Sequence, residues 1–296
     1  AGLATAHKTY LEQTSSKGVD PVVLFVIQPN ERNVFDQRAL EYELLTEHGI
    51  RPIRRTFAQL AGTDTSASLK TSTSELLILA SAQSSDQHQE VSVVYFRAGY
   101  APTDYEGPGN ERAWDVRLLL EKSRAIKCPT VALQLAGAKK VQQVLAEDGV
   151  LEKFLTPQSK TKGKEAGTQA WTGADLQRLR ESWTELYPLD PGSDLGKHAY
   201  ELAMREPQRF VLKPQREGGG NNIYKDDIPP ALQEMERRDK AEGKTGRGDV
   251  TEREAYILMS LIQPPTGVGN LLVKAGAGAK AGAALAEDVV SELGIY

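Results

Sequence analysis

Short runs of apolar residues recur through the first third of the chain, and their spacing predicts alternating strands and helices. Residues 22–27 form a continuous, β-branched apolar run, which favours a strand buried on both faces. Residues 35–47 carry Leu40 and Leu44 at helical spacing and are followed by Gly49, a typical helix stop. Because further strands are predicted beyond this helix, the order of elements indicates an open, mainly parallel α/β sheet.

The other expected elements follow from the same kinds of pattern. The predicted strands lie near Ile53 and over residues 76–79, 91–96, 210–212 and 255–262. The predicted helices cover residues 111–126, with Trp114 and Leu118 on the apolar side, a segment after Gly137, and residues 176–186 and 195–204. Polar loops are predicted at residues 156–164 and 239–249, and an Ala/Gly-rich segment at 275–284. A chain of 296 residues can bury two cores, so we predict two domains, residues 1–125 and 126–296.

Charge and cysteine content argue against several classes of protein. The formal net charge is -4, from 36 Lys and Arg against 40 Asp and Glu, which gives no broad basic field to attract nucleic acid. Cys128 is the single cysteine, so it forms no intrachain disulfide, and no Cys/His spacing is typical of a zinc site. No apolar run approaches the length of about 18 residues that a membrane span needs. We expect a soluble, cytoplasmic protein that binds neither nucleic acid nor a membrane.

Polar residues follow two of the predicted strands at the point where each strand ends. Glu31, Arg32 and Asn33 come after the first strand, and Arg97 and Tyr100 come after the strand over residues 91–96. In open α/β sheets, ligands bind in the crevice beyond the carboxyl ends of the strands. The sequence therefore predicts a binding crevice formed by these two loops.

A glycine run directly after a predicted strand carries a second candidate site. Lys213 precedes Glu217 and three glycines, Gly218 to Gly220, whereas in a P-loop the Lys follows the glycines. The glycine N–H groups can close on phosphate oxygens, Lys213 can supply a positive charge, and Glu217 can bind Mg2+. From this pattern alone, a plain surface turn with ordinary charges is an equal alternative.

Four segments of the chain resemble the eukaryotic glutathione synthetase family. They are residues 213–222 (KPQREGGGNN), 134–143 (QLAGAKKVQQ), 256–259 (YILM) and 291–294 (SELG). The resemblance begins near Val22 and continues in the family's order to Tyr296. It implies an ATP-grasp fold with an inserted α/β substrate-binding domain, and ATP held between two antiparallel sheets. On this interpretation residues 1–125 bind the substrate, and residues 126–296 are the ATP-grasp part with its glycine-rich flap.

The resemblance also implies a role for each matching position. The implied ATP-binding residues are Lys139, Lys213, Gly218, Gly219, Gly220, Asn221, Asn222, Tyr224, Met259, Ser260, Leu261, Ile262 and Glu292. The implied γ-glutamylcysteine-binding residues are Glu31, Arg32, Asn33, Gln37, Arg97, Ala98, Gly99 and Tyr100. Lys213 and Arg97 are the implied catalytic residues, and Glu217 the implied Mg2+ ligand. Ala98 and Ser260 depart from the family pattern, since each stands where an acid is expected.

Several of these positions also have an ordinary structural explanation. Apolar strand residues such as Met259 and Ile262 are more often plain core than a nucleotide slot. Lys139 and Lys140 are typical of a solvated helix face, and Glu292 of an exposed edge. Only the family's register selects these residues as ligands.

The implied reaction is ATP-dependent ligation of glycine to γ-glutamylcysteine through an acyl phosphate, by a homodimer. Such chemistry works by positioning and charge neutralisation and needs no enzyme nucleophile. A ligase for another amine, such as β-alanine, and a truncated non-catalytic fragment that binds nucleotide or forms a dimer are the alternatives. The chain lacks an initiator Met, and residues 291–296 have the pattern of an unfinished strand, so we expect both natural ends to be missing. We therefore expect this chain alone not to ligate at an ordinary enzyme rate.

Overall fold

The computed structural model forms two compact units. Unit 1 comprises residues 1–141 and 215–220, and unit 2 comprises residues 142–214 and 221–296. The structure describes residues 1–14, 20–31, 33–62, 69–71, 76–80, 88–107, 110–155, 171–215, 220–244, 249–265, 267–272, 284–287 and 289–290. The roles assigned to residues 1–125 and 126–296 stay a prediction.

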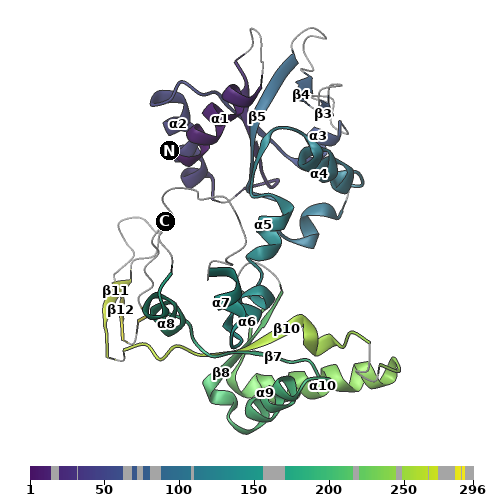
Figure 1. The fold of residues 1–296 in the computed structure, drawn as a ribbon, viewed down its shortest axis with the longest axis vertical. Helices are drawn as coiled ribbons and strands as arrows, with labels where there is room; N and C mark the ends of the chain where they lie inside the picture. The colour runs from purple at the N-terminus through teal and green to yellow at the C-terminus, as the bar shows by residue number, and fades with distance from the viewer. Residues whose placement is uncertain are drawn as a thin grey trace. The chain divides into compact units, whose positions relative to one another are not determined.

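Unit 1 is built on a six-stranded sheet with the order β2-β1-β5-β4-β3, in which β6 also pairs with β5. Figure 1 labels β3, β4 and β5 of this sheet. The strands are β1 (Val22–Val26), β2 (Pro52–Arg55), β3 (Leu69–Thr71), β4 (Leu77–Ala80), β5 (His88–Phe96) and β6 (Ile126–Cys128). Strand β1 is parallel to β2 and to β5, and β5 is parallel to β6, whereas β4 is antiparallel to both β3 and β5. All five residues of β1 are buried, as its continuous apolar run predicts.

Helices cover both faces of this sheet. Unit 1 contains α1 (Gly2–Gln13), α2 (Val34–Thr46), α3 (Phe57–Ala61), α4 (Ala113–Lys122), α5 (Val131–Ala136) and the 3-10 helix η1 (Pro102–Tyr105). Leu44 of α2 packs with Val23 and Phe25 on one face. Leu60 of α3 and Leu120 of α4 pack with the opposite face. This double covering explains why β1, which lies between β2 and β5, is uniformly apolar.

The prediction for residues 111–126 was wrong in two respects. Helix α4 ends at Lys122, and residues 126–128 form β6, because strand pairing with β5 competes with the helix. The buried face of α4 carries Val116, Arg117 and Leu120, while Trp114 and Leu118 are exposed. Apolar residues occur on both sides of this helix, so their spacing did not identify the inner face.

Unit 2 is built on a four-stranded antiparallel sheet with the order β7-β10-β8-β9. Its strands are β7 (Leu186–Pro188), β8 (Phe210–Pro214), β9 (Ile223–Tyr224) and β10 (Tyr256–Ser260). Helices α9 (Asp194–Arg205) and α10 (Ile228–Ala241) lie on one side of this sheet (Figure 1). Leu202 of α9 and Leu232 of α10 close a core against Leu212 and Leu258.

Unit 2 also contains shorter elements. They are α7 (Val150–Leu155), α8 (Gly173–Glu181), β11 (Asn270–Leu272), β12 (Ala284–Ala286), η2 (Pro207–Arg209), η3 (Lys225–Asp227) and η4 (Glu252–Ala255). Helix α6 (Lys139–Ala146) spans the boundary between the two units.

Several elements of unit 2 were not predicted, among them α10 and β7. Helix α10 begins with prolines near its start, where their missing N–H groups leave no helical bond unmade, and it extends into the stretch at 239–249 predicted to be a loop. Strand β7 is only three residues long, too short for a periodic pattern. The predicted loop at 156–164 lies outside the described residues. In the part of the chain that the structure describes, no helix is long and apolar enough to cross a membrane.

Candidate substrate and nucleotide sites

The carboxyl ends of three parallel strands bring the first group of predicted site residues together. Strand β1 lies between β2 and β5, and Val26 near its end is in register with Arg55 of β2 and Phe96 of β5. Glu31 follows β1 and Arg97 follows β5 directly. The two predicted loops therefore meet at one edge of the sheet, as expected for a ligand crevice in an α/β fold.

Hydrogen bonds from its backbone N–H groups hold the loop after β5 in place. The backbone N–H groups of Arg97 and Ala98 both donate to the carbonyl oxygen of Val26, at 2.8 and 3.0 Å. The Oδ2 atom of Asp104 accepts from the N–H groups of residues 99, 100 and 101 at 2.8, 3.2 and 3.2 Å. A single carboxylate thus fixes the backbone that presents Arg97 and Tyr100.

Gly99 occupies a position in this loop that only glycine fits. Its φ is +89°, and a Cβ atom placed there would lie 2.9 Å from the Tyr105 hydroxyl and 3.0 Å from the Phe57 ring. The Tyr105 hydroxyl donates to the Gly99 carbonyl at 2.8 Å, and Gln134 Nε2 donates to the same oxygen at 3.1 Å. Burial raises the pKa of the Tyr105 hydroxyl, which keeps it protonated as a donor.

Arg97 combines one exposed ion pair with an unmatched buried donor. Its Nη2 atom lies 3.3 Å from Oδ2 of Asp36 in the first turn of α2. Its Nε atom is buried and has no hydrogen-bond partner among the described residues. A guanidinium presents its donors in a fork that matches a carboxylate, so a carboxylate ligand would supply the missing partner.

The other predicted dipeptide residues lie around Glu31 and Tyr100. The backbone N–H of Asn33 donates to Glu31 Oε1 at 2.9 Å, and Gln37 Nε2 donates to Glu31 Oε2 at 2.6 Å. Tyr100 is half-exposed, and its hydroxyl accepts from Gln28 Nε2 at 3.1 Å. Ala98 is buried under the loop. Arg32 lies outside the described residues.

In unit 2, strand alternation places Lys213 and Met259 on the same face of the antiparallel sheet. Leu212 and Leu258 point into the core against α9 and α10, so their neighbours point to the opposite face. Lys213 is in register with Ile257, and Val211 with Met259. Val211 and Ile257 on this face are buried, whereas Lys213 and Met259 are partly exposed.

Tyr224 reaches the same face from the neighbouring strand. It is in register with Val211, and its hydroxyl accepts from Asn222 Nδ2 at 3.0 Å. Gly220 has a φ of +96°, a Cβ added to it would meet no atom within 4 Å, and Asn221 beside it is exposed. The described end of the glycine run therefore adopts a backbone that favours glycine and leaves space around it.

The end of β10 carries the other residues of the predicted adenine slot. Ser260 donates through Oγ to Glu185 Oε2 at 2.5 Å, and the N–H of Leu261 donates to the carbonyl of Arg209 at 2.8 Å. Ile262 is exposed. The acid expected at position 260 is absent, but Glu185, directly before β7, brings a carboxylate against the serine that replaces it.

Lys139 is the first residue of helix α6, and Lys140 contacts Gln215, which precedes the glycine run. The backbone N–H of Lys140 donates to Gln215 Oε1 at 2.8 Å. Glu217, Gly218, Gly219 and Glu292 lie outside the described residues. Within the described ranges, no group of three or more His, Cys, Asp or Glu side chains is arranged to hold a metal ion. The Mg2+ site therefore stays a prediction.

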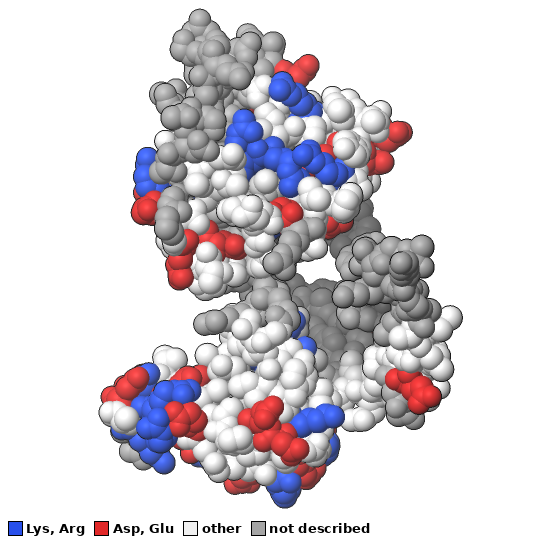
Figure 2. Space-filling model, turned by 180° about the vertical axis from the view of Figure 1, so that it is seen from behind, with Lys and Arg blue, Asp and Glu red and all other residues white. Residues whose placement is uncertain are grey.

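Surface charge differs between the two units. Figure 2 shows Lys and Arg gathered in a band over part of unit 1, whereas Lys and Arg are mixed with Asp and Glu over unit 2. A local basic band is compatible with an anionic small-molecule ligand, and the net charge of the whole chain gives no indication of it.

Comparison with known proteins identifies the family. The model of the eukaryotic glutathione synthase ATP-binding domain matches residues 1–296. The chain belongs to this family. It is 42% identical over 260 residues to glutathione synthetase of Dictyostelium discoideum, covering 88% of this chain and 45% of the relative. It is 40% identical over 275 residues to glutathione synthetase of Homo sapiens, covering 93% and 48%. The chain spans about half the length of these relatives.

One solved structure shows the same fold. A glutathione synthetase-like effector from Globodera pallida superposes with a TM-score of 0.51 at 20% identity, covering 91% of this chain and 46% of that one. Together with the family and the mainly parallel sheet of unit 1, this likeness confirms the predicted fold class, an α/β protein of the ATP-grasp type.

Sequence reasoning missed several residues that the structure places in or beside these sites. Asp104 holds the loop of Arg97, and the signal that could have found it is a proline followed by an acid two residues later, typical of a capped turn. Arg54 and Glu185 act through partners distant in sequence. Nothing in their immediate sequence marks them.

Proposed function

We propose that this protein joins glycine to γ-glutamylcysteine using ATP, the final bond in the synthesis of glutathione. The observation that carries the proposal is the meeting of Glu31, Gln37, Arg97 and Tyr100 at one edge of the unit 1 sheet. These are the positions that the family resemblance assigns to the dipeptide. Arg97 would pair with a carboxylate of the dipeptide, and Glu31 with its α-ammonium group, the only cation that the dipeptide carries.

Residues 126–296 are proposed to bind the nucleotide. Lys213 would neutralise a phosphate of ATP, and Met259 would pack against adenine on the face that both share. Lys139, Asn221, Asn222, Tyr224 and the glycines 218–220 would complete the phosphate contacts, with Ser260, Leu261, Ile262 and Glu292 at the base and ribose. Mg2+ is the proposed cofactor, with Glu217 as its ligand, and when bound it would neutralise phosphate charge.

The proposed reaction has two steps. A carboxylate oxygen of the dipeptide attacks the γ-phosphorus of ATP, the bond to ADP breaks, and an acyl phosphate forms. The glycine amine then attacks the acyl carbon, phosphate leaves, and the amine loses a proton to solvent. The protein's residues hold the reactants and neutralise charge that develops on the transferred group, so no enzyme nucleophile is needed.

A cytoplasmic homodimer is proposed on two grounds. The family resemblance implies the dimer, and a single exposed cysteine suits a reducing compartment. Sedimentation equilibrium of the full-length protein would test the dimer.

The test of the function is ADP release by the full-length protein with ATP, Mg2+, γ-glutamylcysteine and glycine. We expect release to require both amino-acid substrates and to yield glutathione by mass spectrometry. Replacing glycine with β-alanine tests the alternative amine. ATP hydrolysis independent of the dipeptide, or nucleotide binding without any ligated product, would overturn the proposal.

A further inference from the structure

A buried polar network lies beneath the proposed dipeptide site. Gln37 and Glu41 occupy the inner face of α2, where they are 0% and 3% exposed. Arg54, at the end of β2, faces them and has a side chain that is 14% exposed. Buried polar groups persist in folded proteins when they are hydrogen-bonded, so each of these contacts is specified by the fold.

Arg54 bridges two acceptors at once. Its Nη2 atom donates to Gln37 Oε1 at 2.8 Å, and its Nη1 atom donates to Glu41 Oε1. The other oxygen of Glu41 accepts from Arg38 Nη1 at 2.6 Å. The guanidinium is therefore held by an anchored carboxylate on one side and turned toward Gln37 on the other.

Gln37 links Arg54 to Glu31 by hydrogen bonds to both residues. A guanidinium only donates hydrogen bonds and a carboxylate only accepts them, so the amide of Gln37 can point in one direction only. Its oxygen faces Arg54, and its nitrogen donates to Glu31 Oε2 at 2.6 Å. Because Glu31 lies in the loop after β1, this bond ties a loop carboxylate to the rigid sheet.

We propose that Arg54 is a positioning residue for the dipeptide site, which through Gln37 fixes the Glu31 carboxylate toward the α-ammonium group of γ-glutamylcysteine. This inference rests on the proposed function. Gln37 then acts by orienting Glu31, since both ends of its own amide are already engaged.

Because Arg54 donates to two acceptors, one substitution can keep its charge and remove one of the two contacts. Lysine is a point charge that can keep the ion pair with Glu41, but it lacks the rigid fork that serves Gln37 at the same time. Arg54→Lys should therefore keep the buried charge balanced while releasing Gln37 and Glu31. The matched control is Arg51→Lys, three residues earlier, where the side chain is exposed.

The experiment is calorimetric titration of γ-glutamylcysteine into the full-length wild type, Arg54→Lys, Arg51→Lys, Glu31→Gln and the double variant Arg54→Lys/Glu31→Gln. Thermal midpoints and ATP affinity are measured for each protein. We expect Arg54→Lys to raise the dipeptide Kd on the order of tenfold, with ATP affinity and thermal midpoint near wild type. Arg51→Lys should match wild type. The double variant should lose no more than the stronger single variant, because both changes act on one contact.

Four outcomes would overturn the proposal. Wild-type dipeptide affinity in Arg54→Lys would do so and would leave the proposed function intact. Additive losses in the double variant would show that Arg54 does not act through Glu31. A collapsed thermal midpoint in Arg54→Lys would show that Arg54 serves stability and not the positioning of Glu31. A wild-type protein that binds ATP but no γ-glutamylcysteine would remove the proposed function and this inference with it.

Discussion

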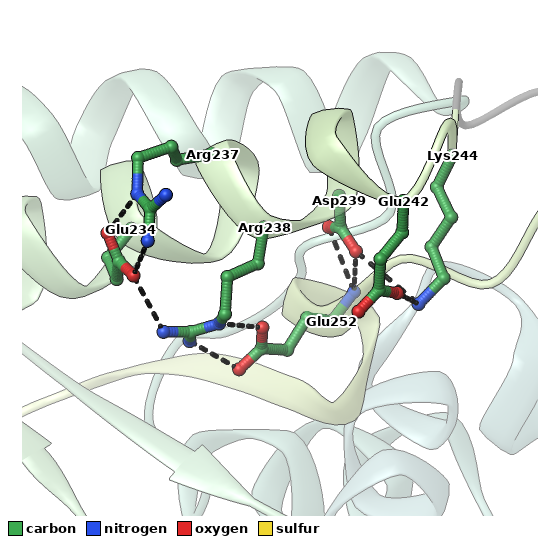
Figure 3. Close-up of polar contacts among 7 residues, drawn as sticks. All are labelled: Glu234, Arg237, Arg238, Asp239, Glu242, Lys244 and Glu252. Atoms are coloured by element: carbon green, nitrogen blue, oxygen red, sulfur yellow. Dashed lines mark hydrogen bonds and ion pairs between the residues drawn. The ribbon is translucent and has the colours of Figure 1, made fainter.

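Two of the networks of arginine and carboxylate groups among the described residues differ mainly in burial. In unit 1, Arg54 and Glu41 are 14% and 4% exposed in their side chains. In unit 2, Arg238 of α10 holds Glu252 of η4 through two bonds of 2.7 and 2.6 Å, with side chains 44% and 35% exposed (Figure 3). The same pair of chemical groups therefore operates in two different dielectric environments.

The surroundings of the two networks differ as well. Arg238 also contacts Glu234, which pairs with Arg237, while Lys244 pairs with Glu242 at 2.7 Å (Figure 3). Asp239 accepts from the backbone N–H of Glu252 and ties η4 to α10. Solvent screens such exposed pairs, whereas a buried pair depends on each partner to neutralise the other. Removing one member should therefore have a large effect in unit 1 and a small one in unit 2.

The largest expected effect is that of Glu41→Ala. It leaves the guanidinium of Arg54 buried without its carboxylate, which typically costs about 3–5 kcal/mol in unfolding free energy. Urea denaturation followed by circular dichroism measures the loss. Glu43→Ala, on the exposed side of the same helix, is the control and should be near neutral. A loss in Glu41→Ala as small as that of the control would show that burial does not separate the two networks.

Gly99→Ala should have the next largest effect on stability. The new methyl group meets Tyr105 and Phe57 at a backbone φ of +89°, and strain of this kind costs on the order of 1–3 kcal/mol before the steric overlap is added. Gly107→Ala is a matched control, because Gly107 has the same φ of +89° and nothing within 4 Å of its added Cβ. Equal losses in the two variants would mean that the loop of Arg97 is not tightly packed.

Lys213→Met tests the nucleotide face of unit 2. A charge-assisted hydrogen bond contributes about 1.5–3 kcal/mol, so the Kd for ATP should rise by on the order of ten- to a hundredfold. Lys240→Met, on the exposed side of α10, should leave the affinity unchanged. Calorimetric titration with ATP gives both values. Wild-type affinity in Lys213→Met, with the fold intact, would remove Lys213 from the nucleotide site.

The smallest expected effect is that of Arg238→Ala, and it should depend on pH. The hydrogen bond from Arg238 lowers the pKa of Glu252 below its ordinary value. The folded protein then binds a proton less readily than the unfolded chain, so this stabilisation is present above the unfolded pKa of Glu252, about 4.5. It is lost as the pH falls through the lower folded pKa.

Unfolding free energies of wild type and Arg238→Ala at pH 7 and pH 3 measure this dependence. The small difference between the two proteins should narrow at pH 3. A difference that widens in acid would contradict the assignment of the pair.

The sequence predicted the helix over residues 35–47 but did not indicate which of its faces is buried. Leu40 and Leu45 are exposed, while Gln37 and Glu41 face inward. Apolar periodicity describes a helix that packs on an apolar surface. Here the inner face of the helix contacts Arg54, a charged residue in the strand that follows the helix in the chain. The sequence does not show this contact, because it forms only when the helix packs on the sheet.

The meeting of the loops after β1 and β5 at one edge of the sheet could be predicted, because parallel strands end at the same edge. The loop geometry could not, since it depends on Asp104 and Tyr105 reaching back to Gly99. In unit 2, Lys213 and Met259 lie on one face because of the register in which β8 pairs with β10, and the sequence did not predict this register. The contact between Glu185 and Ser260 arises from pairing of β7 with β10, which local pattern does not specify.

The central claim is that unit 1 binds the dipeptide and unit 2 binds the nucleotide. Hydrogen–deuterium exchange with each ligand added separately tests this division most directly, because bound ligands slow the opening of the backbone around them. We expect γ-glutamylcysteine to slow exchange in residues 31–37 and 97–105, and ATP with Mg2+ to slow exchange in residues 210–214 and 256–260. Protection of residues 97–105 by ATP alone, with no effect of the dipeptide there, would contradict the account.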